Sequence, residues 1–201
     1  MEQLDSTAII LAGGESSRLG QDKTFADVAN KTIFEREIDV LQKLFSEIII
    51  ISNNPVLFNS SGLKAYKDII PNKGPLGGIL TGLSVSATKN NFVVSCDLPF
   101  LSENVISFLY SQFTNCNLLI PCWQGQLMPL HGFYSKNCLP VIENQISRNE
   151  LKVLAITSHL KTKYIHEHEL KPLDPEGKSF FNVNTLEDLE NARIMARRLY
   201  I

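Results

Sequence analysis

Short apolar runs alternate with amphipathic segments along the chain. Three of the runs, 7–11 (TAIIL), 47–52 (EIIIIS) and 92–96 (FVVSC), are rich in isoleucine and valine. That composition predicts strands of a parallel sheet that are buried on both faces. Two more strands are predicted in the second half of the chain, at 117–121 (NLLIP) and 130–135 (LHGFYS).

The segments between these runs have the spacing of helices. One apolar stripe recurs at helical spacing, and its members are Phe34, Ile38, Leu41 and Phe45. Further helices are predicted over 77–87 and over 137–146, the latter with Pro140 near its start. Another helix is predicted after Ser102, and this serine can cap it.

The last predicted helix covers 185–200. Its predicted apolar side consists of Leu186, Leu189, Ala196 and Leu199. Thr185 and Asp188 occupy the positions that cap a helix N-terminus.

Strand–helix alternation of this kind predicts an α/β fold, a three-layer α/β/α sandwich around a Rossmann-like, mostly parallel sheet. No Gly/Ser-rich tract, charge block or repeat interrupts the 201 residues, so one domain over 1–201 is expected. Ligands of such sheets bind beyond the carboxyl ends of the strands. The loops after Leu11, Ser52 and Ser95 are therefore where a site is expected.

Composition excludes several classes of partner. The 19 basic and 21 acidic side chains give a net charge of −2, so neither nucleic acid nor a membrane surface is an expected partner. The first residues, MEQLDST, do not resemble a signal peptide, and the run IIII is too short to span a bilayer. We expect a soluble cytoplasmic protein. Its four cysteines lack zinc spacing, which favours reduced, mostly buried thiols.

The first predicted strand runs into the sequence LAGGESSRLGQDK, residues 11–23. Gly13 and Gly14 let the backbone approach a ligand, its N–H groups can cradle phosphate, and Arg18 and Lys23 add positive charge. The spacing matches neither the Walker loop nor the dinucleotide fingerprint GxGxxG. We interpret the stretch as a loop around a nucleoside triphosphate; the alternative is an exposed turn that carries two cations.

Two more loops follow predicted strands. In NKGPLGGILTGL (72–83), two glycines open a helix whose N-terminal amides can face an anionic or polar group. In FVVSCDLPF (92–100), Asp97 directly follows a strand, where one carboxylate is enough to hold Mg²⁺ against a triphosphate. The alternatives are a plain Gly/Pro loop for the first stretch and a turn-capping role for Asp97.

These stretches resemble a known family. LAGGESSRLGQDK is similar to the LAGGxSxRMGxDK signature of the MobA-like nucleotidyltransferases, and GPLGG and SCDLPF match its second and third motifs in order. FFNVNTLEDLENA resembles the NVNTPEDL segment of the molybdenum cofactor guanylyltransferase branch, and MPLHGFYSKNCLP resembles its PLxAxYxxxxLP pattern. The resemblance covers essentially the whole chain and is weakest between Asn144 and Gly177. It implies the nucleotide-diphospho-sugar transferase type of fold.

The resemblance implies an Mg²⁺-dependent enzyme that joins GMP from GTP to molybdenum-loaded molybdopterin and releases pyrophosphate. Proteins that load molybdopterin, and chaperones of molybdoenzymes, are further partners that it suggests. The residues implied for the nucleotide are Leu11, Ala12, Gly13, Gly14, Asn54 and Asp68, with Arg18 and Lys23 at the phosphates and Asp97 at the metal. Asn182 and Asn184 are implied on the molybdopterin side.

The chain departs from the family pattern at a few positions. Leu19 replaces the usual methionine, and ANKT replaces NGKP before the helix at Thr32. Ser52 stands where a binding asparagine is common, so Asn53 or Asn54 is expected to substitute.

Other functions stay open on sequence alone. They are a molybdopterin cytidylyltransferase, a sugar-phosphate nucleotidyltransferase of the same fold, and a non-catalytic GTP-binding molybdopterin carrier. We interpret Cys96 as a buried structural thiol and the stretch HEHE (166–169) as solvated surface. His131 is a candidate for approaching the substrate.

Overall fold

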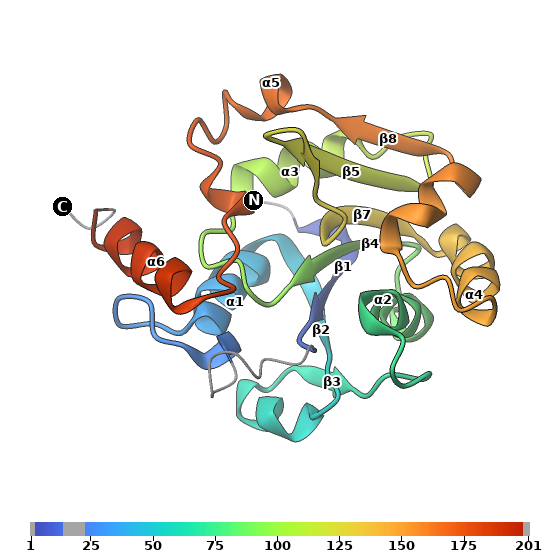
Figure 1. Cartoon of the computed structure of the whole chain (residues 1–201), viewed down its shortest axis with the longest axis horizontal. Coiled ribbons are helices and arrows are strands. Elements are labelled where there is room, and N and C mark those ends of the chain that lie inside the picture. Colours follow the sequence, from blue (N-terminus) through green and yellow to red (C-terminus); the bar gives the residue numbers. More distant parts are fainter. Residues whose placement is uncertain (1–2, 14–22, 199–201) are drawn as a thin grey trace.

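The computed structural model describes residues 3–13 and 23–198 (Figure 1). In this part of the chain the strands form one eight-stranded sheet. They are β1 (Leu4–Leu11), β2 (Phe45–Ile51), β3 (Lys64–Tyr66), β4 (Asn90–Ser95), β5 (Leu118–Trp123), β6 (Gln126–Leu127), β7 (His131–Ser135) and β8 (Thr162–Ile165). The α-helices are α1 (Ile33–Leu44), α2 (Gly74–Val85), α3 (Glu103–Gln112), α4 (Leu139–Ser147), α5 (Glu167–Leu170) and α6 (Leu186–Arg198).

The strand order is β3-β2-β1-β4-β7-β5, and both β6 and β8 pair with β5. β3, β2, β1 and β4 run parallel to one another, and β7 runs antiparallel to its neighbours β4 and β5. α1 and α3 pack on one face of the sheet, and α2 and α4 pack on the other. The predicted three-layer sandwich with a mostly parallel sheet is confirmed, with β7 and the two-residue β6 as the antiparallel strands among those described.

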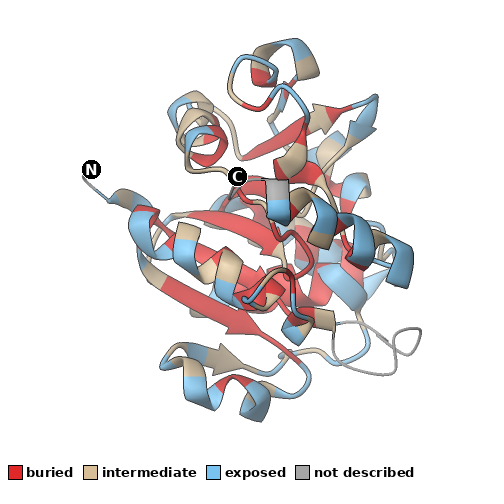
Figure 2. Cartoon of the chain, turned by 90° about the vertical axis from the view of Figure 1, so that its left-hand side faces the viewer, coloured by how far each residue is buried: buried red, intermediate tan, exposed pale blue. Residues whose placement is uncertain are grey.

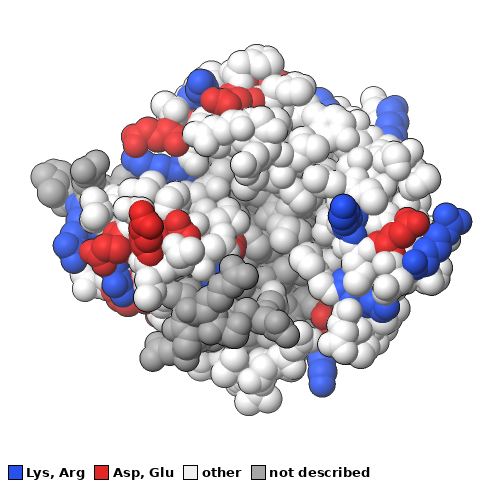
Figure 3. Space-filling view, viewed as in Figure 1, with Lys and Arg blue, Asp and Glu red and all other residues white. Residues whose placement is uncertain are grey.

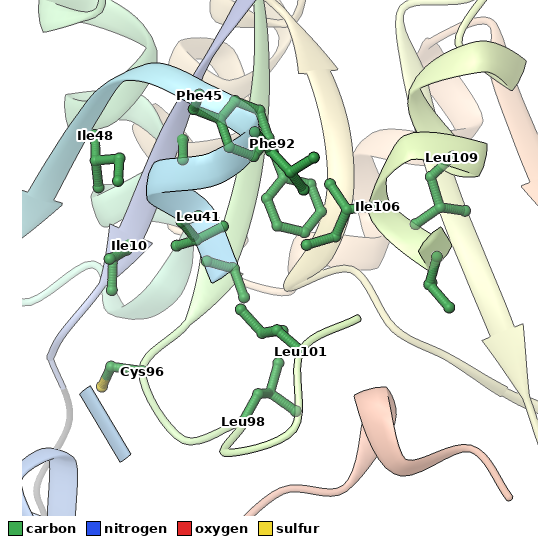
Figure 4. Packing of buried hydrophobic residues seen from close by; sticks show 14 of the residues in the cluster. Ile10, Leu41, Phe45, Ile48, Phe92, Cys96, Leu98, Leu101, Ile106 and Leu109 are labelled. Atoms are coloured by element: carbon green, nitrogen blue, oxygen red, sulfur yellow. The ribbon is translucent and has the colours of Figure 1, made fainter. Parts of the chain in front are cut away.

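Alternating side chains of the central strands point to the two faces. In β1, Ile10 packs with Leu41 of α1, whereas Ile9 packs with Ile79 and Leu83 of α2. The central strands are therefore buried on both faces, as Figure 2 shows, and Figure 4 shows the packing on the α1 side. This double burial explains why these strands are isoleucine- and valine-rich runs rather than alternating apolar and polar residues.

The helix boundaries follow capping chemistry. Thr32 and Glu35 form a capping box at the start of α1, and the Ser102 hydroxyl accepts the Val105 N–H as predicted for α3. Thr185 Oγ1 accepts the Asp188 N–H at 3.1 Å, which confirms the predicted cap of α6. These local hydrogen bonds determine where the helices that flank the site begin.

Three details differ from the sequence-based expectation. α2 begins at Gly74 rather than near 77, because Pro75 suits the first turn of a helix. Phe45 belongs to β2, not to the stripe of α1. The buried side of α6 is Leu189, Ala192 and Ala196, which pack on Val28 and Ile33, while Leu186 in the first turn lies beside this contact and is 68% exposed. Leu199 lies outside the described residues.

Two other sequence-based expectations concern cysteines and membranes. Cys96 and Cys138 are buried, while Cys116 and Cys122 are partly exposed, and all four thiols are free. Within residues 3–13 and 23–198, no helix has the length and apolar character needed to cross a bilayer.

Candidate active site

A pocket of about 450 Å³ opens beyond the carboxyl ends of β1, β2 and β4. The loops after Leu11, Ser52 and Ser95 all reach it, as the sequence predicted. Figure 3 shows this face of the molecule hollowed near its centre, with charged side chains gathered toward the rim. The described residues that line the pocket are Leu11, Gly13, Lys23, Ile51, Ser52, Asn53, Asp68, Asn72, Gly74, Pro75, Gly78, Ser95, Cys96, Asp97 and Leu130.

Backbone hydrogen bonds hold the strand ends that form the floor of this pocket. Ala12 N–H donates to the Ile51 carbonyl at 2.8 Å, and Cys96 N–H donates to the Leu11 carbonyl at 3.3 Å. These bonds continue the sheet pairing of β1 with β2 and β4 for one residue past the strands. The first residues of all three loops therefore start from a rigid edge, which is what precise positioning of a ligand requires.

A charged pair lies at the mouth of the pocket. Lys23 Nζ is 3.0 Å from Asp97 Oδ2, and the two side chains are 20% and 10% exposed. Lys23 Nζ also donates to Asn184 Oδ1 at 2.9 Å. The structure thus brings together three residues that the family resemblance implied, from the first loop, the loop after β4 and the segment before α6.

The segment before α6 also contacts Asp97 directly. Val183 N–H donates to the Asp97 carbonyl at 2.9 Å, and Asn182 Nδ2 is 3.5 Å from Asp97 Oδ1. Ser95 Oγ donates to the same Oδ1 at 2.6 Å. Asp97 is therefore oriented by neighbours on both sides, and hydrogen bonds from fixed donors keep such a carboxylate in place.

Asp68 lines the pocket beside α2. Thr81 Oγ1 lies 3.5 Å from Asp68 Oδ1 and also accepts the Ile69 N–H at 3.0 Å. Burial raises the pKa of the Asp68 carboxyl. A Cβ on Gly78 would lie 3.1 Å from Leu11 Cδ2, so this glycine keeps the pocket wall open between α2 and β1.

A second carboxyl lies behind Asp97 and was missed by the sequence reasoning. Glu37 of α1 is fully buried, and its Oε1 accepts the Leu98 N–H at 2.9 Å. Its Oε2 has no hydrogen-bond partner among the described residues. Burial raises the pKa of Glu37 well above its usual value. The sequence signal was available: Glu37 interrupts the apolar stripe of α1, three residues after Phe34 and four before Leu41.

Cys96 and His131 are both buried. Burial raises the pKa of the Cys96 thiol to about 12, although Thr24 Oγ1 donates to its Sγ at 3.2 Å and acts in the opposite direction, so Cys96 does not form a thiolate near neutral pH. His131 packs edge-on against Phe92 and is 4.8 Å from the Phe180 ring, between ring centres. It is not one of the described residues that line the pocket.

Several residues implied by the resemblance remain predictions. Gly14 and Arg18 lie outside the described residues. Ser52 and Asn53 line the pocket, whereas Asn54 precedes the 3₁₀ helix Pro55–Ser61 and donates its N–H to Ser52 Oγ at 3.2 Å. Which of these three side chains contacts a nucleotide is a question for mutagenesis.

The donor set at Asp97 fits a hard divalent cation. The described residues contain no group of three or more His, Cys, Asp or Glu that could enclose a metal. The single carboxylate of Asp97, which lines the pocket, offers oxygen ligands only. Mg²⁺ is commonly bound by one or two carboxylates and completes its shell with phosphate and water.

Comparison with known proteins identifies the family. A family model described as the MobA-like NTP transferase domain matches residues 8–162. The chain is 34% identical over 193 residues to a probable molybdenum cofactor guanylyltransferase of Pelotomaculum thermopropionicum, covering 96% of this chain and 94% of that protein. It is 31% identical over 189 residues to a molybdenum cofactor guanylyltransferase of Syntrophotalea carbinolica, covering 93% and 90%.

Solved structures share the fold. Molybdopterin-guanine dinucleotide biosynthesis protein A of Archaeoglobus fulgidus superposes with a TM-score of 0.84 at 23% identity, over 96% of this chain and 99% of that one. The 2-C-methyl-D-erythritol 4-phosphate cytidylyltransferase of Thermus thermophilus gives 0.68 at 11% identity, over 94% and 98%. The family-model match and the relatives above 30% identity establish that this chain belongs to the MobA-like NTP transferase family.

Proposed function

We propose that this protein transfers GMP from GTP to molybdenum-loaded molybdopterin, which forms the guanine dinucleotide cofactor and releases pyrophosphate. Relatives with the name molybdenum cofactor guanylyltransferase align with more than nine-tenths of the chain. The observation that carries the proposal is the convergence of Lys23, Asp97 and Asn184 at the mouth of the pocket. A cation, a metal-holding acid and a polar group for the acceptor are the parts that nucleotidyl transfer needs.

GTP is proposed to bind with its base beside α2 and its phosphates toward Lys23. In this arrangement Asp68 and Gly78 belong to the base side, and the backbone of Leu11, Ala12 and Gly13 follows the nucleotide. A carboxylate beside the base can accept N–H groups, and glycine at position 78 leaves room for a flat ring. Gly14, Arg18 and Asn54 complete the proposed nucleotide contacts.

The reaction is an in-line displacement at the α-phosphorus. A terminal phosphate oxygen of molybdopterin forms the new P–O bond, and the bond from the α-phosphorus to the bridging oxygen breaks as pyrophosphate leaves. Lys23 neutralises charge on the phosphates, and Asn182 and Asn184 orient the pterin side. Asp97 would hold Mg²⁺, and that ion supplies charge neutralisation at phosphate oxygens. The acceptor is already an anion, so no protein nucleophile is required.

The test is pyrophosphate release from the purified protein with Mg²⁺, one nucleotide at a time, and either molybdenum-loaded molybdopterin or a sugar phosphate as the acceptor. We expect release with GTP and little with CTP, ATP or UTP. A preference for CTP would assign a cytidylyltransferase, and turnover only with a sugar phosphate as acceptor would assign a sugar-phosphate nucleotidyltransferase. Tight GTP binding without any pyrophosphate release would support the non-catalytic carrier.

We also propose a cytoplasmic location, and contacts with proteins that load molybdopterin and with chaperones of molybdoenzymes. These proposals rest on the family resemblance. Cell fractionation tests the first, and co-purification with and without loaded pterin tests the second.

A further inference from the structure

The peptide unit that follows Asp97 is held at both of its polar ends. Its carbonyl oxygen, on Asp97, accepts the Val183 N–H at 2.9 Å. Its N–H, on Leu98, donates to Glu37 Oε1, also at 2.9 Å. The two partners come from α1 and from the segment before α6, so distant parts of the chain fix one peptide plane.

Apolar packing alone does not set this plane. Leu98 and Leu101 are buried with Leu41 on the α1 face of the sheet, as Figure 4 shows. Such contacts anchor the loop but are not directional, whereas a hydrogen bond depends steeply on angle. A displacement of this loop backbone would carry the Asp97 carboxylate away from Lys23. The Glu37 bond, together with the Val183 bond, therefore adds a directional restraint on the backbone beside Asp97.

Glu37 supplies an oxygen acceptor to the Leu98 N–H. It is fully buried, and Lys23, a cation of the described part of the site, pairs with Asp97. Burial raises the Glu37 pKa well above its usual value, and the charge of Asp97 acts in the same direction. A carboxyl group offers an oxygen to the Leu98 N–H whether or not it carries a proton.

We propose that Glu37 is a positioning residue for nucleotidyl transfer: by accepting the Leu98 N–H it fixes the direction of the Asp97 carboxylate. This inference rests on the proposed function, because Asp97 is the residue through which Glu37 acts. Glu37 itself is buried and is not one of the described residues that line the pocket.

Three variants separate this role from a purely structural one. Glu37→Gln keeps an oxygen acceptor of the same reach, and Glu37→Met fills similar space without one. The matched control is Gln145→Met on α4, since Gln145 is also buried and its Nε2 donates to the Lys152 carbonyl at 2.8 Å, remote from the pocket. Both methionine variants remove one buried side-chain hydrogen bond, so similar losses of stability are expected.

The readouts are kcat and KM for GTP in pyrophosphate release, and the affinity for Mn²⁺ alone by electron paramagnetic resonance. For Glu37→Met we expect kcat to fall about 10-fold to 100-fold with little change in KM, because a displacement of about 1 Å costs that much. Mn²⁺ affinity is expected to fall several-fold. Glu37→Gln is expected to stay within about twofold of wild type, and Gln145→Met to keep wild-type kcat and Mn²⁺ affinity.

Wild-type kcat and Mn²⁺ affinity in Glu37→Met would overturn the proposal. An equal loss in Glu37→Gln would also overturn it, since charge rather than the acceptor would then matter. If Glu37→Met does not fold, Glu37→Asp carries the test: its acceptor is displaced by one methylene, and full activity would refute the positioning role. If wild-type protein releases no pyrophosphate from any nucleotide, the proposed function fails, while the Mn²⁺ comparison still tests how Glu37 positions Asp97.

Discussion

Lys23 Nζ lies 3.0 Å from Asp97 Oδ2, so the cation and the acid proposed for catalysis neutralise each other in this structure. One ammonium group cannot serve the carboxylate and a triphosphate equally well. We therefore expect an incoming nucleotide to compete with Asp97 for Lys23, and the carboxylate to become free for a divalent cation as the lysine turns to the phosphates. Nucleotide and metal are expected to bind together more tightly than either alone.

Replacement of Lys23 is expected to reduce the stabilisation of the transition state. Lys23→Met should lower kcat/KM by about 10²-fold to 10³-fold, or ~3–4 kcal/mol, the scale for one preorganised electrostatic group. Steady-state pyrophosphate release measures this, and Lys171→Met, which breaks an exposed pair with Glu167, is the control. An increase in GTP KM with unchanged kcat would show instead that Lys23 assists only ground-state binding.

Asp97→Asn is expected to abolish metal-dependent turnover without unfolding the protein. The amide has the shape of the carboxylate and keeps an oxygen for the Ser95 hydroxyl, but it lacks the charge that holds Mg²⁺. We expect at least about a 10²-fold loss of kcat in pyrophosphate assays and a melting temperature close to wild type. Wild-type rates in the folded variant would remove Asp97 from the mechanism.

Because His131 is buried, the free energy of unfolding is expected to fall in acid. Burial lowers its pKa to about 3, whereas an unfolded chain binds this proton near pH 6.5. Above pH 6.5, protonation of His131 therefore has no effect on the free energy of unfolding. As the pH falls from 6.5 toward 3, the unfolded chain binds the proton first and the free energy of unfolding decreases, by about 2 kcal/mol at pH 5. His131→Leu should show a correspondingly smaller difference in urea-unfolding free energy between pH 7.5 and 5.0.

The control for this measurement is His159→Gln, because the His159 side chain is exposed. It is expected to reproduce the wild-type difference between the two pH values. The same acid-induced loss in His131→Leu and wild type would assign the effect to other groups.

Gly132 is expected to tolerate no side chain. A Cβ there would lie 2.4 Å from the Leu119 carbonyl oxygen of the neighbouring strand β5, and this backbone atom cannot yield without breaking the sheet. Gly132→Ala should lower the unfolding free energy by about 3 kcal/mol. Gly62→Ala is the control: φ is +71° and nothing lies within 4 Å, so only about 1 kcal/mol of backbone strain is expected. Equal losses in chemical denaturation would contradict the steric argument.

The central strands and most helices were predictable because their signals are local. Runs such as TAIIL indicate burial on both faces, and Ser102 and Thr185 mark helix starts through their own hydroxyls. The short strands β3 and β8 were not predicted, since three or four half-exposed residues become strands only through their partners. Nothing in the sequence HGFYS reveals that β7 runs antiparallel, because its burial reads the same in both directions.

The candidate site likewise has a part that the sequence could predict and a part that it could not. Lys23 and Asp97 follow β1 and β4, and those strands are neighbours in a parallel sheet, so their meeting could be inferred. Asn182 and Asn184 depended on resemblance alone, because no local signal says that a segment 85 residues after Asp97 returns to it. Glu37 could have been noticed as an acidic residue within the apolar stripe of α1. It was missed because core residues were selected for their apolar character.

The hydrogen bond between Lys23 and Asn184 joins residues 161 positions apart in the sequence. Translation therefore delivers Lys23 well before Asn184. A nascent chain that ends before residue 182 has Lys23 without the Asn184 amide, and Asp97 without the Val183 N–H and the Asn182 amide. The proposed catalytic centre can form only after residues 182–184 have been synthesised.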